Sequence, residues 1–263
     1  GVYDPMKTVI FTSATLRTGN NYNYWMNRSG VNLVEKERIC TENFDSPFPY
    51  HKNMLFLVPS DAPFSHLGEF QQYIEIALPR LITAAGGRTL VLFTSYDSLK
   101  SAYNSVFSQL RDFSGSILKQ GDMDNAVLLK KFKEERESVL FATDSFWQGV
   151  DVPGDSLSQV IIVKLPFSVP NDPVFMARSE EIEKKGGSSF MEMSVPEAVI
   201  KFRQGVGRLI RKGNDRGTVV VLDKRLYEKQ YGRIFLSSLP ECKMKYEPFM
   251  DIVSSIKSFL DND

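Results

Sequence analysis

The chain has 263 residues and a formal net charge of zero at pH 7, because 32 Lys and Arg balance 32 Asp and Glu. With 42% hydrophobic and 24% charged residues, it has the composition of a globular protein, which excludes a disordered chain, a collagen and a coiled coil. The apolar runs are too short to span a membrane and no signal peptide is recognisable. Cys40 and Cys242 are too few for a disulfide scaffold or a four-thiolate iron–sulfur site, so a reduced, cytoplasmic location with no membrane partner is expected.

Short apolar runs bounded by turn residues are predicted to be strands. Most of these runs are continuous rather than alternating, which indicates burial on both faces and is typical of a parallel sheet. The runs are residues 8–11, 54–58, 89–93, 116–119, 139–142, 159–163 and 218–222.

Helical patterns lie between these runs. They are residues 67–84, 98–110, 126–135, 195–212 and 249–260, and Pro79 is expected to kink the first. Strands that alternate with helices predict an open α/β sheet with right-handed crossovers.

Two stretches fit this alternation less well. Residues 12–53 contain one expected helix around 21–29, and residues 165–194 contain one charged, helix-like piece between prolines and glycines. Excursions at strand ends often line the ligand crevice of an α/β sheet, whereas surface insertion is an equally good interpretation of either loop alone.

The pattern at 195–212 begins with the signature of a capping box. Ser194 stands at the N-cap position and Glu197 three residues later, with Pro196 in the first turn. The apolar stripe that follows is predicted to face the core and consists of Val195, Ala198, Val199, Phe202, Val206 and Leu209.

A polar stripe runs along the same predicted helix. Gln204, Arg208 and Arg211 have i, i+4, i+7 spacing and would share one face. Gly205 and Gly207 would each cost about 1 kcal/mol relative to Ala inside a helix, which is tolerated where a ligand approaches the backbone. Two guanidinium groups and an amide suit a polyphosphate. The alternative, a solvated basic face at a helix C-terminus, explains either arginine alone better than the whole string.

The string from Gln204 to Arg211 resembles the sixth conserved motif of superfamily 2 helicases, Q-x-x-G-R-x-x-R. Residues 12–16 (TSATL), 91–96 (VLFTSY) and 142–151 (ATDSFWQGVD) resemble the third, fourth and fifth motifs, in the same order. The surrounding strings, 146–154 and 216–225, resemble the DinG branch of the XPD-like DNA helicases. This similarity covers most of the chain and implies an α/β, RecA-like fold, with an open, mostly parallel sheet flanked by helices on both faces.

Such helicases have two RecA-like domains, and the first carries the phosphate-binding loop G-x-x-x-x-G-K-[ST] and an acidic D-E-x-H motif. Neither string occurs in this sequence. The resemblance therefore implies a connecting segment with the third motif at 1–50 and the second RecA-like domain at 51–263. ATP and Mg²⁺ would be bound mainly by the first domain, so this chain is expected to hold no metal and, alone, to be nearly inactive as an ATPase.

The resemblance implies a role for each residue of the nucleotide cleft. Arg211 would be the arginine finger, Arg208 would face the phosphates, and Gln204 would orient the attacking water or contact the γ-phosphate. Gly149 would supply a sharp turn before Asp151, which would contact the nucleotide or couple it to the sixth motif. A strand-end cap is the alternative for Asp151.

Contacts to single-stranded DNA are implied for hydroxyl groups of the fourth and fifth motifs and for one aromatic ring. Phe146 could stack on a base as well, although an aromatic residue beside a strand end more often belongs to the core. Ser13 and Thr15 would couple the ATP state to the contact with the strand. The residues implied to contact DNA are Thr94, Ser95, Thr143, Ser145 and Trp147.

Three functions compete at this level. The first is the C-terminal half of an ATP-dependent DNA helicase of the DinG family. The second is a helicase-derived nucleic-acid-binding domain of a DinG-type 3′–5′ exonuclease, with an upstream exonuclease domain and no helicase activity left. The third, a small-molecule α/β enzyme, is disfavoured because the sequence has no G-x-G-x-x-G turn and no G-x-S-x-G elbow.

Overall fold

A single seven-stranded parallel sheet forms the centre of the computed structural model, which describes residues 3, 5–19, 21–143, 146, 157–168 and 172–261. The strand order is β3-β4-β2-β5-β6-β1-β7. The strands are β1 Met54–Pro59, β2 Thr89–Leu92, β3 Ile117–Lys119, β4 Val139–Ala142, β5 Gln159–Ile162, β6 Gly217–Val221 and β7 Lys243–Glu247.

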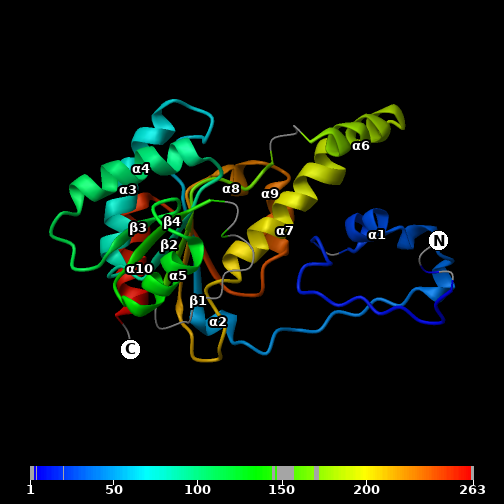
Figure 1. Cartoon of the computed structure of the whole chain (residues 1–263), viewed down its shortest axis with the longest axis horizontal. Coiled ribbons are helices and arrows are strands. Elements are labelled where there is room, and N and C mark those ends of the chain that lie inside the picture. The colour runs from blue at the N-terminus through cyan, green and yellow to red at the C-terminus, as the bar shows by residue number, and fades with distance from the viewer. Residues whose placement is uncertain are drawn as a thin grey trace.

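Helices cover both faces of this sheet (Figure 1). α3, α4 and α10 pack on one face, and α5, α7, α8 and α9 pack on the other. The predicted α/β architecture is therefore confirmed. The helices are α1 Asn23–Ser29, α2 Tyr50–Asn53, α3 Glu69–Ala84, α4 Tyr96–Gln109, α5 Asn125–Glu134, α6 Pro173–Lys184, α7 Val195–Val206, α8 Arg225–Glu228, α9 Gly232–Ser237 and α10 Phe249–Leu260.

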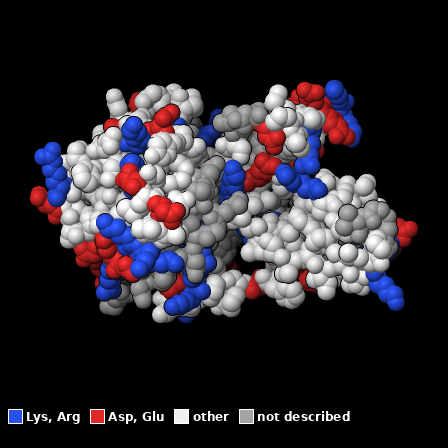
Figure 2. All heavy atoms as spheres, in the orientation of Figure 1, with Lys and Arg blue, Asp and Glu red and all other residues white. Residues whose placement is uncertain are grey.

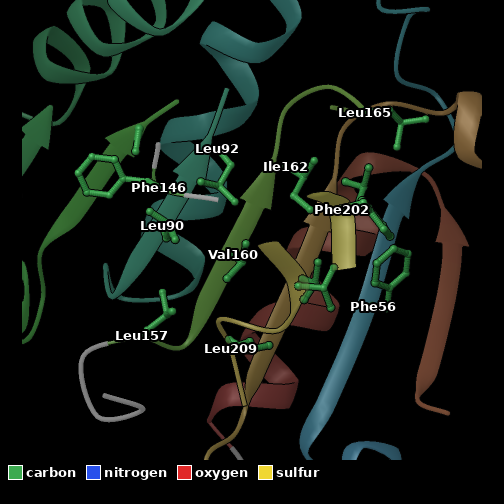
Figure 3. Close-up of a cluster of buried hydrophobic side chains, with 14 of the residues drawn as sticks. Phe56, Leu90, Leu92, Phe146, Leu157, Val160, Ile162, Leu165, Phe202 and Leu209 are labelled. Carbon is green, nitrogen blue, oxygen red and sulfur yellow. The ribbon is translucent and has the colours of Figure 1, made fainter. Parts of the chain in front are cut away.

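The helices on both faces of the sheet explain why its strands are apolar at consecutive positions. In β1, Phe56 packs on the α7 side and Leu57 on the α10 side, and both are fully buried. Figure 3 shows the first cluster, where Phe56 and Phe202 meet between the sheet and α7. Successive residues of a strand point to opposite faces, so a sheet covered twice requires apolar residues at every position.

Two predictions about strands need correction. Residues 8–11 are not a strand: Ile10 is 83% exposed, and no described strand pairs with this run. An apolar run forms a strand only where a neighbouring strand accepts its backbone hydrogen bonds. Conversely, β7 was not predicted, because Lys243 and Lys245 give it a polar pattern. It is an edge strand, where lysines are common.

The predicted helix 195–212 is shorter than expected. α7 ends at Val206, with Gly207 as its C-cap residue. The capping box is wrong too, since Ser194 has helical backbone angles and makes no side-chain cap bond. A π-helix, Phe190–Ser194, runs directly into α7 and supplies a carbonyl acceptor, that of Phe190, to the N–H of Val195. Because the preceding turn is helical, the first N–H groups of α7 need no side-chain cap.

Residues 5–49 form a segment beside the sheet rather than within it (Figure 1). This N-terminal segment contains α1 and the 3₁₀ turns Val31–Leu33 and Lys36–Arg38 before the chain enters α2. Glu197 of α7 holds α1 through hydrogen bonds from Tyr24 (2.8 Å) and Arg28 (2.5 Å). Within the described residues, no helix is long and apolar enough to cross a membrane.

Candidate functional site

The turn that follows α7, residues 207–212, carries both arginines of the predicted sixth motif and is called the arginine turn below. Arg208 and Arg211 therefore do not lie on the helix itself. The Asp215 carboxylate accepts hydrogen bonds from the backbone N–H groups of Arg211 (2.7 Å) and Lys212 (2.8 Å). Asp215 is only 7% exposed, so a buried charge fixes the backbone from which the Arg211 side chain extends.

Gln204 and Arg208 are the more buried part of this motif. Arg208 is 8% exposed, and its backbone N–H donates to the carbonyl oxygen of Gly205 at 3.2 Å. The side-chain oxygen of Gln204 is buried and has no hydrogen-bond partner among the described residues. An unsatisfied buried acceptor costs about 1–3 kcal/mol, and such groups are often retained for a function.

The arginine turn is anchored to the amino ends of two central strands. A Cβ on Gly217, the first residue of β6, would lie 2.6 Å from Leu209 Cδ1, so Leu209 packs directly on that strand end. Asn53, immediately before β1, donates from Nδ2 to the carbonyl oxygen of Gly213 at 2.9 Å. The position of the turn is therefore set by β1 and β6.

The predicted third motif lies in the part of the N-terminal segment that α7 holds. The Arg203 guanidinium donates to the backbone oxygens of Arg17 (2.7 Å) and Ala14 (2.8 Å). Ser13 Oγ and Thr15 Oγ1, the predicted coupling groups, lie 3.2 Å apart in the same stretch. Burial and the nearby charge of Arg17 lower the pKa of Arg203. α7 thus contacts the third motif through the residue directly before Gln204.

The residues predicted to contact nucleic acid lie where the strands end, on the side of the sheet opposite the arginine turn. This row of carboxyl ends of the strands is called the carboxyl edge below. Thr94 and Thr143 follow the carboxyl ends of the neighbouring strands β2 and β4. Thr143 donates from its N–H (2.7 Å) and its hydroxyl (3.0 Å) to Gln120 Oε1, beyond the end of β3. Ser95 is the N-cap residue of α4 and accepts from the N–H of Ser98 at 3.3 Å. These residues are brought together, but they are separated from the arginine turn.

Four of the predicted site residues, Ser145, Trp147, Gly149 and Asp151, lie outside the described residues. Phe146 is described, and it is 1% exposed within the hydrophobic cluster drawn in Figure 3. The prediction that Phe146 stacks on a base is therefore wrong, and the core alternative is confirmed.

Sequence reasoning missed three residues that organise these sites. Arg203 directly precedes Gln204, and an arginine beside a motif is a plausible donor to backbone carbonyls. Asp215 follows Gly213 in a polar turn, a common place for a carboxylate that accepts backbone N–H groups. Gln120 comes directly after an apolar run, where a polar residue marks a strand end. Among the described residues, no group of three His, Cys, Asp or Glu could hold a metal ion.

A parallel sheet covered by helices on both faces defines the class of the fold. Residues 78–242 match the family model described as the helicase C-terminal domain, and the chain belongs to this family. Relatives named YoaA and DinG match the chain, and the resemblance to the DinG branch is thereby confirmed.

Two curated relatives and one solved structure are similar to the chain. It is 44% identical over 234 residues to the ATP-dependent DNA helicase YoaA of Haemophilus influenzae, covering 88% of this chain and 35% of that protein. It is 35% identical over 242 residues to the 3′–5′ exonuclease DinG of Bacillus subtilis, covering 89% of this chain and 25% of that protein. The solved structure of S. tokodaii Xpd4 shares the fold, with a TM-score of 0.53 at 17% identity, covering 80% of this chain and 42% of that one. The chain thus spans about a third or a quarter of the curated relatives named here.

Proposed function

We propose that this chain is the C-terminal motor domain of an ATP-dependent DNA helicase, with residues 51–263 as its second RecA-like domain and residues 1–50 as the connecting segment. The observation that carries this proposal is the arginine turn. Its backbone is fixed by the buried Asp215 carboxylate, and the unsatisfied oxygen of Gln204 is buried one helical turn earlier. A fixed backbone suits Arg211, because an arginine finger must approach the phosphoryl group in one geometry.

The residues present fit a nucleoside triphosphate held mainly by another domain. Arg211 acts as the arginine finger and, with Arg208, stabilises negative charge on the transferring phosphoryl group. Gln204 Oε1 is a hydrogen-bond acceptor, so it orients the attacking water by accepting a hydrogen bond from it. ATP and Mg²⁺ would be held mainly by the first RecA-like domain, as the resemblance to superfamily 2 helicases implies.

Single-stranded DNA crosses the carboxyl edge of the sheet in this proposal. Ser95 Oγ already accepts a bond from the N–H of Ser98, so its hydroxyl proton is available to a phosphate oxygen. The Thr143 hydroxyl donates its hydrogen bond to Gln120. Thr143 therefore positions the DNA-binding surface and does not itself donate to a phosphate. Through Arg203, α7 links the third motif to the sixth and carries the coupling.

The test uses the intact parent protein. We expect ATP hydrolysis stimulated by single-stranded DNA, and we expect Arg211→Ala to lower that turnover at least about a hundred-fold, because arginine fingers contribute about 10³–10⁵ in rate. Lys212→Ala, which removes the neighbouring, exposed charge, is the matched control and is expected to retain turnover. Equal turnover in Arg211→Ala and wild type would contradict the assignment of Arg211 as the arginine finger.

One relative favours a second candidate. The Bacillus subtilis protein is named a 3′–5′ exonuclease, although the chain covers only a quarter of it. A wild-type parent without any DNA-stimulated ATP hydrolysis, but with binding of single-stranded DNA, would identify this chain as a helicase-derived binding domain of an exonuclease.

A further inference from the structure

Two lysines share one aromatic ring at the carboxyl edge of the sheet. Lys224 Nζ lies 4.5 Å and Lys229 Nζ lies 5.6 Å from the centre of the Phe64 ring. The Phe64 ring in turn stacks on His66, with centres 5.7 Å apart and planes 28° from parallel. His66 and Lys229 are exposed, whereas Phe64 and Lys224 are half-buried. The outer ring and one ammonium group of this stack therefore face solvent.

A third lysine extends this group across the sheet. Lys164 follows β5, and its Nζ lies 5.1 Å from the centre of the Phe70 ring. Burial lowers the pKa of Lys164, while the charge of Asp223 acts in the opposite direction. Lys164, Lys224 and Lys229, with the rings of Phe64 and His66, are called the lysine shelf below.

The lysines of the shelf form no ion pairs among the described residues. Asp223 is fully buried and is bound by Arg225, whose Nε lies 2.9 and 3.0 Å from its two carboxylate oxygens. Neither Lys224 nor Lys229 has a side-chain hydrogen bond or an ion pair among the described residues. Elsewhere, acidic and basic side chains are mixed, as the face drawn in Figure 2 shows. A chain of zero net charge thus keeps lysines without ion-pair partners beside aromatic rings.

Two lysines of the shelf, Lys164 and Lys224, follow the carboxyl ends of the neighbouring strands β5 and β6. Along the order β4-β2-β5-β6-β1, successive carboxyl ends are followed by Thr143, Thr94, Lys164, Lys224 and the loop that bears Phe64. Neighbouring strands lie about 4.8 Å apart, so these five strand ends span about 19 Å. A nucleic-acid strand advances about 3.4 Å per nucleotide when stacked, so the edge accommodates at most about six nucleotides.

We propose that the lysine shelf binds single-stranded nucleic acid, as a second half of the track that begins at Thr94 and Ser95. This inference rests on the proposed function and extends it from hydroxyl groups to cations and rings. The ammonium groups bind phosphates, and a base stacks on the exposed face of His66. Both contacts are independent of base identity, so the shelf binds without sequence preference.

The experiment measures binding of a fluorescein-labelled oligothymidylate to the intact parent by anisotropy, over a series of salt concentrations. For Lys224→Ala combined with Lys229→Ala, we expect the negative slope of log affinity against log salt to become less steep by about 1.4, because each phosphate contact on a single strand contributes about −0.7. His66→Ala is expected to weaken binding about five-fold or more at fixed salt, with the salt slope unchanged.

Two further variants serve as controls. Lys100→Ala combined with Lys257→Ala removes two exposed charges from α4 and α10, on a helical face of the sheet, and is expected to leave the slope unchanged. Lys224→Arg combined with Lys229→Arg is expected to retain the wild-type slope. Thermal unfolding of each variant identifies any loss that comes from misfolding.

The outcomes separate this inference from the proposed function. A wild-type parent that does not bind the oligothymidylate overturns both. A wild-type parent that binds it, with the same slope in the shelf variant and in the α4/α10 control, overturns the lysine shelf alone. Competition by polyglutamate as strong as that by unlabelled oligothymidylate would assign the shelf to an acidic protein partner and overturn the inference as well.

Discussion

At the scale of single residues, Asp215 is the side chain on which the geometry of the arginine turn depends most directly. It accepts two backbone N–H groups, one of which belongs to Arg211 itself. Hydrogen bonds to a charged acceptor contribute about 1.5–3 kcal/mol each, more than those between neutral groups. The carboxylate is nearly buried, so water replaces it poorly.

Asp215→Ala tests this dependence. We expect DNA-stimulated turnover of the parent to fall at least about ten-fold, because a small displacement of a catalytic group is costly. The free energy of unfolding is expected to fall by at least about 3 kcal/mol, because two N–H groups lose a charged acceptor worth about 1.5–3 kcal/mol each. Asp251→Ala, at an exposed position of α10, is the control. The measurements are steady-state ATP hydrolysis and urea unfolding. Lost stability with full turnover would show that the turn supports the fold alone.

At the scale of elements, α7 connects three parts of the molecule. Its apolar side packs on the sheet, Glu197 holds α1, and Arg203 holds the stretch with the predicted third motif. The arginine turn leaves its C-terminal end. A displacement of the N-terminal segment is therefore transmitted to α7 through side chains rather than through the backbone.

Arg203→Gln tests whether α7 holds the N-terminal segment. We expect faster hydrogen–deuterium exchange in residues 13–18, because the donors to the carbonyl oxygens of Ala14 and Arg17 are lost. The midpoint of thermal unfolding is expected to change little, since these bonds lie outside the sheet. Arg233→Ala, at an exposed position of α9, provides the comparison. Unchanged exchange at 13–18 would show that other contacts hold the segment.

The sequence predicted elements well where one local signal was sufficient. The central strands and the last helix have patterns set by their own burial, and α10 occupies the predicted residues. The end of α7 was missed because Leu209 is buried after the helix has ended, at a spacing that continues the apolar stripe. The run 8–11 was misassigned because a strand also requires a neighbour, which hydropathy does not reveal. Asp215 and Arg203 were missed because they bind backbone atoms, and only their positions beside Gly213 and Gln204 pointed to them.

At the scale of the whole molecule, the sheet and the N-terminal segment contribute unequally to stability. The segment exposes large apolar side chains, including those of Leu33 and Phe44, and contributes none to the two central clusters before Phe48. The C-terminal part, by contrast, supplies β7 beside β1 and buries Phe249, Ile252 and Ile256 of α10.

A pair of truncations tests this inequality and the predicted boundary at residue 51. We expect removal of residues 1–47 to leave a chain that unfolds cooperatively in urea. Removal of residues 243–263 is expected to abolish cooperative unfolding, because it leaves one edge of β1 unpaired and uncovers the part of β1 and β6 on which α10 packs. Circular dichroism during the titration distinguishes the two. Cooperative loss of structure after the C-terminal deletion would place the stable unit elsewhere.

The strand order also has a consequence for synthesis. β1 lies between β6 and β7, the two strands that the ribosome delivers last among those described, and all its residues are buried in the finished sheet. At about 5–20 residues per second, a nascent chain carries β1 unpaired for roughly ten to thirty seconds. During that interval an apolar strand with free edges is open to chaperones and to neighbouring chains on the same message. The speed of translation between β1 and β6 is therefore a variable on which the yield of folded protein depends.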